Sequence, residues 1–145
     1  MNWREEAAEK LRRYSAMEKA VKNIPQEISR LQLESTALRS PRLDGLGVRG
    51  GGGDREDALL NNIVRRQELK RTHRGAKLWV GMTDRALDAL TEEERLILSS
   101  LYIYPVRGAL DDLCEKLQVE KSSIYRKRDK ALERFTLALY GELEN

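Results

Sequence analysis

The chain has 145 residues, of which 35% are charged and only 6% aromatic, and its formal net charge is +3. This composition favours a heavily solvated helical protein over a compact enzyme with a large core. Cys114 is the only cysteine, which excludes an intramolecular disulfide and indicates a reducing compartment. The sequence contains neither an apolar run of bilayer length nor a signal peptide, so we expect a cytoplasmic protein with no membrane partner.

Positive charge is concentrated in two stretches. Residues 61–90 contain seven Lys and Arg against three Asp and Glu, and residues 121–134 contain six against two, so each stretch carries +4. Residues 91–145 taken together carry −2. Such local concentrations indicate an anionic partner better than the net charge does, although solvated helix faces give the same pattern.

Residues 1–40 are predicted to form an N-terminal helical segment. Its inward side chains alternate at spacings of three and four, the heptad pattern of a coiled-coil candidate. They are Tyr14, Met17, Val21, Ile24, Ile28, Leu31, Ser35 and Leu38. Pro25 lacks a backbone donor, so it either kinks one helix or begins a second one. The seam serves either packing within the chain or a homodimer.

A Gly-rich linker is predicted over residues 41–57, followed by a second long helical segment over 58–90. The linker precedes no Gly-Lys-Ser/Thr and follows no apolar strand, which argues against a phosphate-binding loop. We expect the second segment to fold back antiparallel on the first, with Trp3 and Trp79 as anchors. Its incomplete apolar stripe contains Leu60, Ile63, Val64, Gln67, Leu78, Val80, Met82, Ala86, Leu87 and Leu90. Its candidate phosphate contacts, which solvent exposure alone also explains, are Arg65, Arg66, Lys70, Arg71, Arg74 and Lys77.

Residues 91–145 are predicted to form a separate helical domain. Thr91 and Glu94 have the spacing of a capping box, so a helix begins there and continues to about Tyr104. Its inward residues are predicted to be Leu96, Ile97, Leu101 and Tyr104. A short helix over 109–117 buries Leu110, Leu113, Cys114 and Leu117. A turn over 118–120 leads to a last helix, which begins at Lys121 or Ser122 and ends near Tyr140.

The last two helices have the pattern of a helix-turn-helix motif, which presents the start of its second helix to the DNA major groove. The second helix can bury Ile124, Ala131, Leu132 and Phe135, while Val119 fills the turn. The candidate DNA-binding residues are Lys121, Ser122, Ser123, Tyr125, Arg126, Arg128 and Lys130. Arg126 can bond two acceptors on guanine, whereas Arg128 and Lys130 suit phosphates. The alternative is a basic helix that only packs in a bundle.

Residues 90–135 resemble the region-4 domain of bacterial sigma factors, with 121–126 at the DNA-reading positions. The whole chain resembles phage late-gene regulators of the RinA/ArpU type, through 9–14, Asn23-Ile-Pro25, the Gly run, 55–69 and Ser122-Ser-Ile-Tyr-Arg126. The resemblance implies an all-α, phage- or prophage-encoded, DNA-binding activator of packaging and morphogenesis genes. Two departures from the sigma pattern are Gln118, where the turn often has Gly, and Lys127, where an apolar residue often packs. The turn is therefore wider, or Gln118 has a strained φ.

Two other functions remain open. A small terminase-like DNA-packaging subunit also joins helical oligomerisation segments to a helix-turn-helix. A helical adaptor that binds RNA polymerase would use the acidic surroundings of the motif, formed by Asp111, Asp112 and Glu115. His73 and Cys114 make neither a metal cluster nor a nucleophile pair, so we expect no enzyme, cofactor or metal site.

Overall fold

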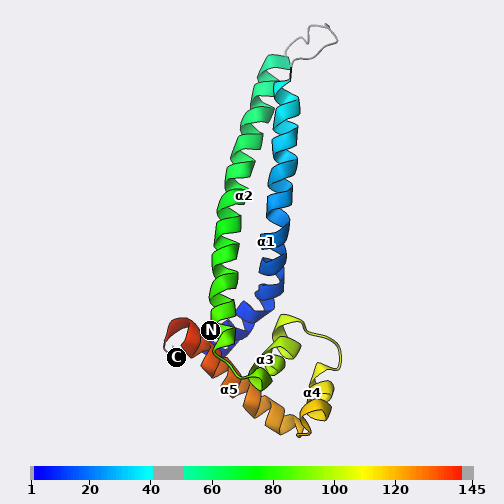
Figure 1. Cartoon of the computed structure of the whole chain (residues 1–145), viewed down its shortest axis with the longest axis vertical. Coiled ribbons are helices and arrows are strands. Elements are labelled where there is room, and N and C mark those ends of the chain that lie inside the picture. The colour runs from blue at the N-terminus through cyan, green and yellow to red at the C-terminus, as the bar shows by residue number, and fades with distance from the viewer. Residues whose placement is uncertain (1, 41–50, 142–145) are drawn as a thin grey trace. The chain divides into compact units, whose positions relative to one another are not determined.

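The computed structural model describes residues 2–40 and 51–141, and these residues form an all-α protein, as the sequence predicts. The chain order is α1 (Trp3–Arg39), α2 (Gly51–Asp88), α3 (Glu92–Leu98), the π-helix η1 (Ser99–Ile103), α4 (Ala109–Leu117) and α5 (Lys121–Tyr140), as Figure 1 shows. None of the helices in this described part combines the length and apolarity that a membrane crossing requires.

The chain divides into two compact units. The hairpin unit consists of Lys19–Lys77, and the terminal unit combines Met1–Glu18 with Leu78–Asn145. The hairpin unit therefore contains the middle and end of α1 and most of α2, whereas the terminal unit contains the start of α1, the end of α2 and all later helices. Each unit has its own packing, described separately below.

In the hairpin unit, α1 continues as one helix through Pro25, so the predicted alternative of a second helix beginning there is wrong. The Pro25 side chain is exposed, while the seam residues on either side of it are at least half-buried. The six predicted seam residues of this unit are buried or half-buried, as are Tyr14 and Met17, which belong to the terminal unit. Packing along the seam therefore outweighs the one backbone hydrogen bond that proline removes.

The predicted linker is too long at its C-terminal end. Residues 51–57 belong to α2, which begins at Gly51, while residues 41–50 lie outside the described residues. The Arg55 side chain donates hydrogen bonds to the main-chain oxygens of Leu38 and Ser40. These oxygens lie at the end of α1, where carbonyls lack helical partners. A side chain of α2 therefore caps α1, which the glycine content alone does not reveal.

The inward face of α2 in the hairpin unit differs from the predicted apolar stripe. Leu60 and Val64 are 59% and 44% exposed, and Gln67 is also exposed, so the prediction is wrong for these residues. The residues that turn inward alternate at spacings of three and four and are Leu59, Asn62, Arg66, Leu69, His73 and Ala76. Three of these six are polar, and for this reason the stripe is hard to see in the sequence.

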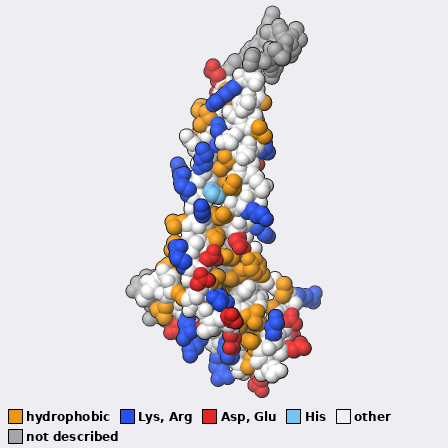
Figure 2. Space-filling view, viewed as in Figure 1, with side chains coloured by type: hydrophobic (Ala, Val, Ile, Leu, Met, Phe, Trp, Pro, Cys, Tyr) orange, Lys and Arg blue, Asp and Glu red, His pale blue; other side chains and the backbone are white. Residues whose placement is uncertain are grey.

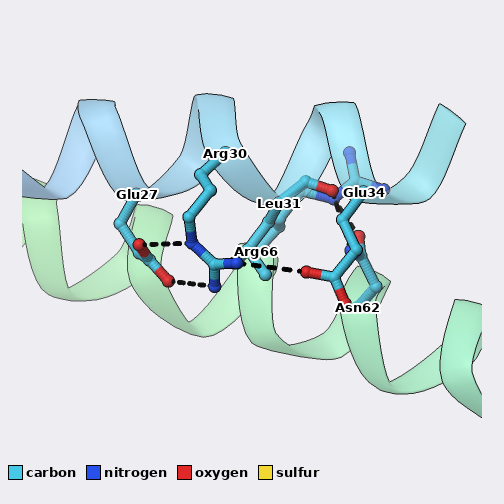
Figure 3. Close-up of polar contacts among 6 residues, drawn as sticks. All are labelled: Glu27, Arg30, Leu31, Glu34, Asn62 and Arg66. Carbon is cyan, nitrogen blue, oxygen red and sulfur yellow. Dashed lines mark hydrogen bonds and ion pairs between the residues drawn. The ribbon is translucent and has the colours of Figure 1, made fainter. Parts of the chain in front are cut away.

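Two of the three polar residues of this inward face bond to the backbone of α1, and the third, Arg66, bonds to Asn62. Asn62 Nδ2 donates to the Leu31 oxygen at 2.8 Å, and Arg66 Nε donates to Asn62 Oδ1 at 2.8 Å (Figure 3). His73 Nε2 lies 3.1 Å from the Val21 oxygen, which can only accept, so this nitrogen carries the hydrogen. The contacts pair later residues of α2 with earlier residues of α1, so the helices are antiparallel, as predicted.

The terminal unit has a core assembled from both ends of the chain. Its buried residues are Ala7, Leu11, Tyr14, Ala86, Leu90, Leu98, Ile103, Ala131, Leu132 and Phe135. Trp3 and Trp79 both pack against this cluster, as predicted for the two anchors. The Tyr14 hydroxyl donates to Asp84, and burial followed by the nearby carboxylates raises the pKa of Tyr14 far above its usual value. Of the predicted α2 stripe, Leu78 and Met82 are instead 64% and 39% exposed.

The predicted capping box begins α3. Glu94 N donates to Thr91 Oγ1 at 3.2 Å, and Thr91 N donates to Glu94 Oε1 at 3.0 Å. The α-helix then gives way to the π-helix η1, whose wider turn places both Leu98 and Ile103 in the core of the terminal unit. Tyr104 is 51% exposed and donates to Glu18 Oε1 at 2.6 Å, so its predicted inward position is wrong.

Candidate nucleic-acid interface

The turn between α4 and α5 depends on an unusual backbone conformation at Gln118. Its φ of 54° lies in the left-handed region, where glycine is the usual residue. The amide of Val119 donates to the Cys114 oxygen at 3.1 Å, which closes the end of α4. Of the two predictions for this turn, the strained φ is therefore confirmed. The turn brings the start of α5 directly beside the end of α4.

Apolar packing on both sides of the turn fixes the rotation of α5. Ile124 is fully buried against Ile97 and Leu113, and Val119 packs against the same cluster, as predicted. Further along α5, Ala131, Leu132 and Phe135 are at most 2% exposed. Partly buried Leu96, Leu101, Leu110, Cys114 and Leu117 complete the packing around the turn. With this face held inward, the remaining faces of α5 are available to a partner.

The first two turns of α5 present polar side chains to solvent. Lys121, Ser122 and Arg126 are exposed, and Tyr125 is 43% exposed. Lys121 Nζ lies 3.5 Å from Asp111 Oδ1 of α4, and Arg126 Nη2 donates to Ser123 Oγ at 3.3 Å. Both contacts are made by exposed side chains, so they stabilise little and yield readily to a charged ligand.

Arg128 and Lys130 have different surroundings. The Arg128 guanidinium donates to Asp129 Oδ1 at 2.9 and 3.1 Å and lies 5.0 Å from the centre of the Tyr125 ring. It is therefore half-buried in contacts within α5, whereas Lys130 is exposed. Of the two predicted phosphate-binding residues, Lys130 is the more accessible.

A hollow between the first turn of α3 and the basic side of α5 is a feature that sequence reasoning missed. Its lining residues are Thr91, Glu93, Glu94, Ile97, Lys127, Lys130 and Arg134. Lys127 Nζ lies 2.6 Å from Glu93 Oε1, and Arg134 Nη1 lies 3.1 Å from Glu94 Oε1. The spacing of Lys127, Lys130 and Arg134 by three and four residues is a signal that would have placed them on one side of α5.

The electrostatics of this hollow favour an ionised Glu94. Burial acts to raise the pKa of Glu94, but hydrogen bonds from Thr91 and the charge of Arg134 outweigh it, and the net shift is downward.

A second hollow along α5 is lined by Ser123, Arg126, Lys127 and Lys130. The structure thus brings the predicted Ser123, Arg126 and Lys130 together with Lys127, which stands where the sigma pattern often has an apolar residue.

The second set of predicted contacts lies on α2 in the hairpin unit and is not uniform. Arg65 Nη1 lies 3.6 Å from Glu68 Oε2, and the half-buried Arg66 is bonded to Asn62. The other four members of the set are exposed and are Lys70, Arg71, Arg74 and Lys77.

Across the described ranges 2–40 and 51–141, no three His, Cys, Asp or Glu side chains converge as a metal site requires. Comparison of the chain with protein-family models, with curated proteins and with solved structures finds no match.

Proposed function

We propose that this protein is a transcriptional regulator that binds a specific sequence in double-stranded DNA through the first half of α5. The observation that carries the proposal is the combination of a buried Ile124 with exposed Lys121, Ser122, Tyr125 and Arg126 on the same two helical turns. A helix held in this way by a preceding short helix presents its N-terminal side chains to the major groove.

The chemistry of these side chains suits duplex DNA. Arg126 carries a planar guanidinium that can donate two hydrogen bonds to the O6 and N7 atoms of guanine. Lys127 and Lys130 are point charges suited to phosphates. The ion pair between Lys127 and Glu93 is made by partly exposed side chains, 40% and 44% accessible, so exchange of the carboxylate for a phosphate costs little.

The regulatory role rests on the resemblance of the chain to phage late-gene regulators and of residues 90–135 to sigma region 4. On this proposal the protein acts in the cytoplasm of a bacterial host, is encoded by a phage or prophage, and activates packaging and morphogenesis genes. RNA polymerase is the second partner, since region 4 acts beside it. The α1 seam is already covered by contacts within the chain, which favours packing over its proposed use in a homodimer.

The direct test is recovery of DNA fragments by the purified full-length chain from a pool of fragmented phage or prophage genome at near-physiological salt. Enrichment of one short motif upstream of a structural or packaging operon is the expected result. Enrichment of a packaging-start region, together with a closed ring of eight or more chains by mass, would replace the proposal with a packaging subunit. Failure to enrich any fragment, with capture of RNA polymerase, would replace it with an adaptor.

A further inference from the structure

The seam of the hairpin unit has two flanks with different charge. The inward residues of α1 and α2 both follow a heptad pattern, and the two helices are antiparallel. Residues at the same heptad position of the two helices therefore lie on the same side, or flank, of the seam. The mixed flank is formed by Glu27, Arg30, Glu34, Arg65 and Glu68. The basic flank is formed by Lys22, Lys70, Arg74 and Lys77.

On the mixed flank, positive and negative side chains neutralise each other. Arg30 lies 2.7 Å from Glu27 Oε1 and 3.3 Å from Glu34 Oε2, and Figure 3 shows its guanidinium facing the Glu27 carboxylate. The hydrogen bond from Arg30 lowers the pKa of Glu27, and the charge of Arg65 on α2 lowers it further. This effect of Arg65 agrees with its placement beside Glu27. Arg65 itself pairs with Glu68 at 3.6 Å.

On the basic flank, the charges are not neutralised. All four side chains are exposed, and within the described part of the chain none has a carboxylate oxygen closer than the 4.0 Å of an ion pair. The residues at the equivalent positions between them are neutral and are Pro25, Ser29, Gln32, Ile63 and Gln67, whereas Glu18, one turn before Lys22 on α1, is acidic and accepts a hydrogen bond from Tyr104. On the visible face, Lys and Arg side chains outnumber acidic ones along the middle of the hairpin (Figure 2).

The spacing on the basic flank suits a linear polyanion. Lys70, Arg74 and Lys77 follow each other at four and three residues, so neighbours are about 5–6 Å apart along one side of α2. Adjacent phosphates on one strand of duplex DNA rise about 3.4 Å along the helix axis, and their direct separation is larger because the strand also winds around that axis, so this row can meet adjacent phosphates. The row has no exposed aromatic side chain for stacking on unpaired bases, which favours a duplex over a single strand.

We propose that the basic flank of the hairpin unit binds the phosphate backbone of double-stranded DNA and reads no bases. The inference rests on the proposed DNA-binding function and adds a second, sequence-independent surface to it. Contacts of this kind release counterions, so they contribute affinity that falls steeply with salt and is the same for every sequence. The α5 surface supplies the sequence preference.

The test uses two full-length variants with the same loss of charge on opposite flanks. Lys70→Gln with Arg74→Gln removes two charges from the basic flank, and Arg30→Gln with Arg65→Gln removes two from the mixed flank. Binding to a random-sequence duplex and to a duplex carrying the selected site is measured by fluorescence anisotropy between 50 and 200 mM KCl. Circular dichroism checks that both variants keep the helical content of the wild type.

For the basic-flank variant, the plot of log binding constant against log salt concentration should become less steep by about two units on both duplexes. Each phosphate contact contributes about 0.9 to the steepness of this plot. The affinity of this variant should fall at least about tenfold on both near 0.1 M salt, with an unchanged ratio between them. The mixed-flank variant should stay close to the wild type, because its arginines are already paired. An unchanged slope in the first variant, or equal losses in both, overturns the basic-flank contact.

Failure of the proposed function gives a different result. In that case the wild type shows no preference for any sequence, whatever the slopes of the two variants. If the wild type prefers the selected site but Lys70→Gln with Arg74→Gln leaves affinity and salt dependence unchanged, the regulator proposal stands and only the proposed DNA contact of the basic flank is wrong.

Discussion

The side-chain amide of Asn62 donates a 2.8 Å hydrogen bond to the main-chain oxygen of Leu31 across the seam of the hairpin unit. Asn62 is only 5% exposed, and its own oxygen accepts from Arg66. The Leu31 oxygen has two lone pairs, one of which serves the helix itself, so the amide adds a bond without replacing one. A buried polar residue at such a position fixes the alignment of two helices at a cost in stability.

Two substitutions at Asn62 should therefore differ in effect. Asn62→Ala removes the bond and leaves a void, and it should lower the free energy of unfolding by about 1–2 kcal/mol. Asn62→Leu fills the seam with an apolar side chain and should be neutral or stabilising. Urea denaturation followed by circular dichroism measures both. A larger decrease in the free energy of unfolding for Asn62→Leu than for Asn62→Ala would contradict this account of the seam.

Replacement of Gln118 by glycine is expected to stabilise the protein. Its φ of 54° costs a side-chain-bearing residue about 1 kcal/mol, which glycine does not incur. After allowance for the greater freedom of glycine in the unfolded chain, Gln118→Gly should raise the free energy of unfolding by about 0.5 kcal/mol. Thermal denaturation measures the change. Gln118→Ala serves as the control and should give no gain, because alanine experiences the same strain.

Arg126→Ala should weaken binding to the selected DNA site by about 1–3 kcal/mol and affect random DNA much less, because it removes a base contact. Quantitative gel shifts on the two duplexes measure the difference. Lys116→Ala removes the same charge from an exposed position on α4 and is the matched control. Equal losses on both duplexes would show that Arg126 contacts phosphate rather than a base.

Glu94 should make the terminal unit sensitive to acid. Its pKa is lowered on folding, so the ionised form contributes stability above the unfolded pKa of about 4.3, and this is lost as pH falls through the folded pKa. Glu94→Gln keeps the capping box but cannot ionise. The variant should be less stable than the wild type at pH 7, and the difference should shrink below about pH 4. Urea denaturation at pH 7 and below about pH 4 measures the difference in free energy of unfolding between the variant and the wild type. The same difference at both would contradict the prediction.

Local signals in the sequence predicted much of the terminal unit correctly. Thr91 and Glu94 form their capping box, α5 runs from Lys121 to Tyr140, and its inward residues are those that the periodicity selects. Each of these features depends on residues within a few positions of one another. The exposed positions at the start of α5 follow from the same periodicity, so the candidate interface was largely predictable.

The sequence by itself determined the all-α class and the seam of α1, because helix propensity, caps and heptad spacing are written in neighbouring residues. Only the tertiary structure decided that α2 turns Asn62 and His73 inward, since their partners are backbone oxygens of α1 far away in the chain, and Arg66 follows because it bonds to Asn62. It likewise decided the pairing of Lys127 with Glu93, which requires α3 and α5 to meet. A polar side chain looks solvent-exposed in a sequence until the fold supplies its partner.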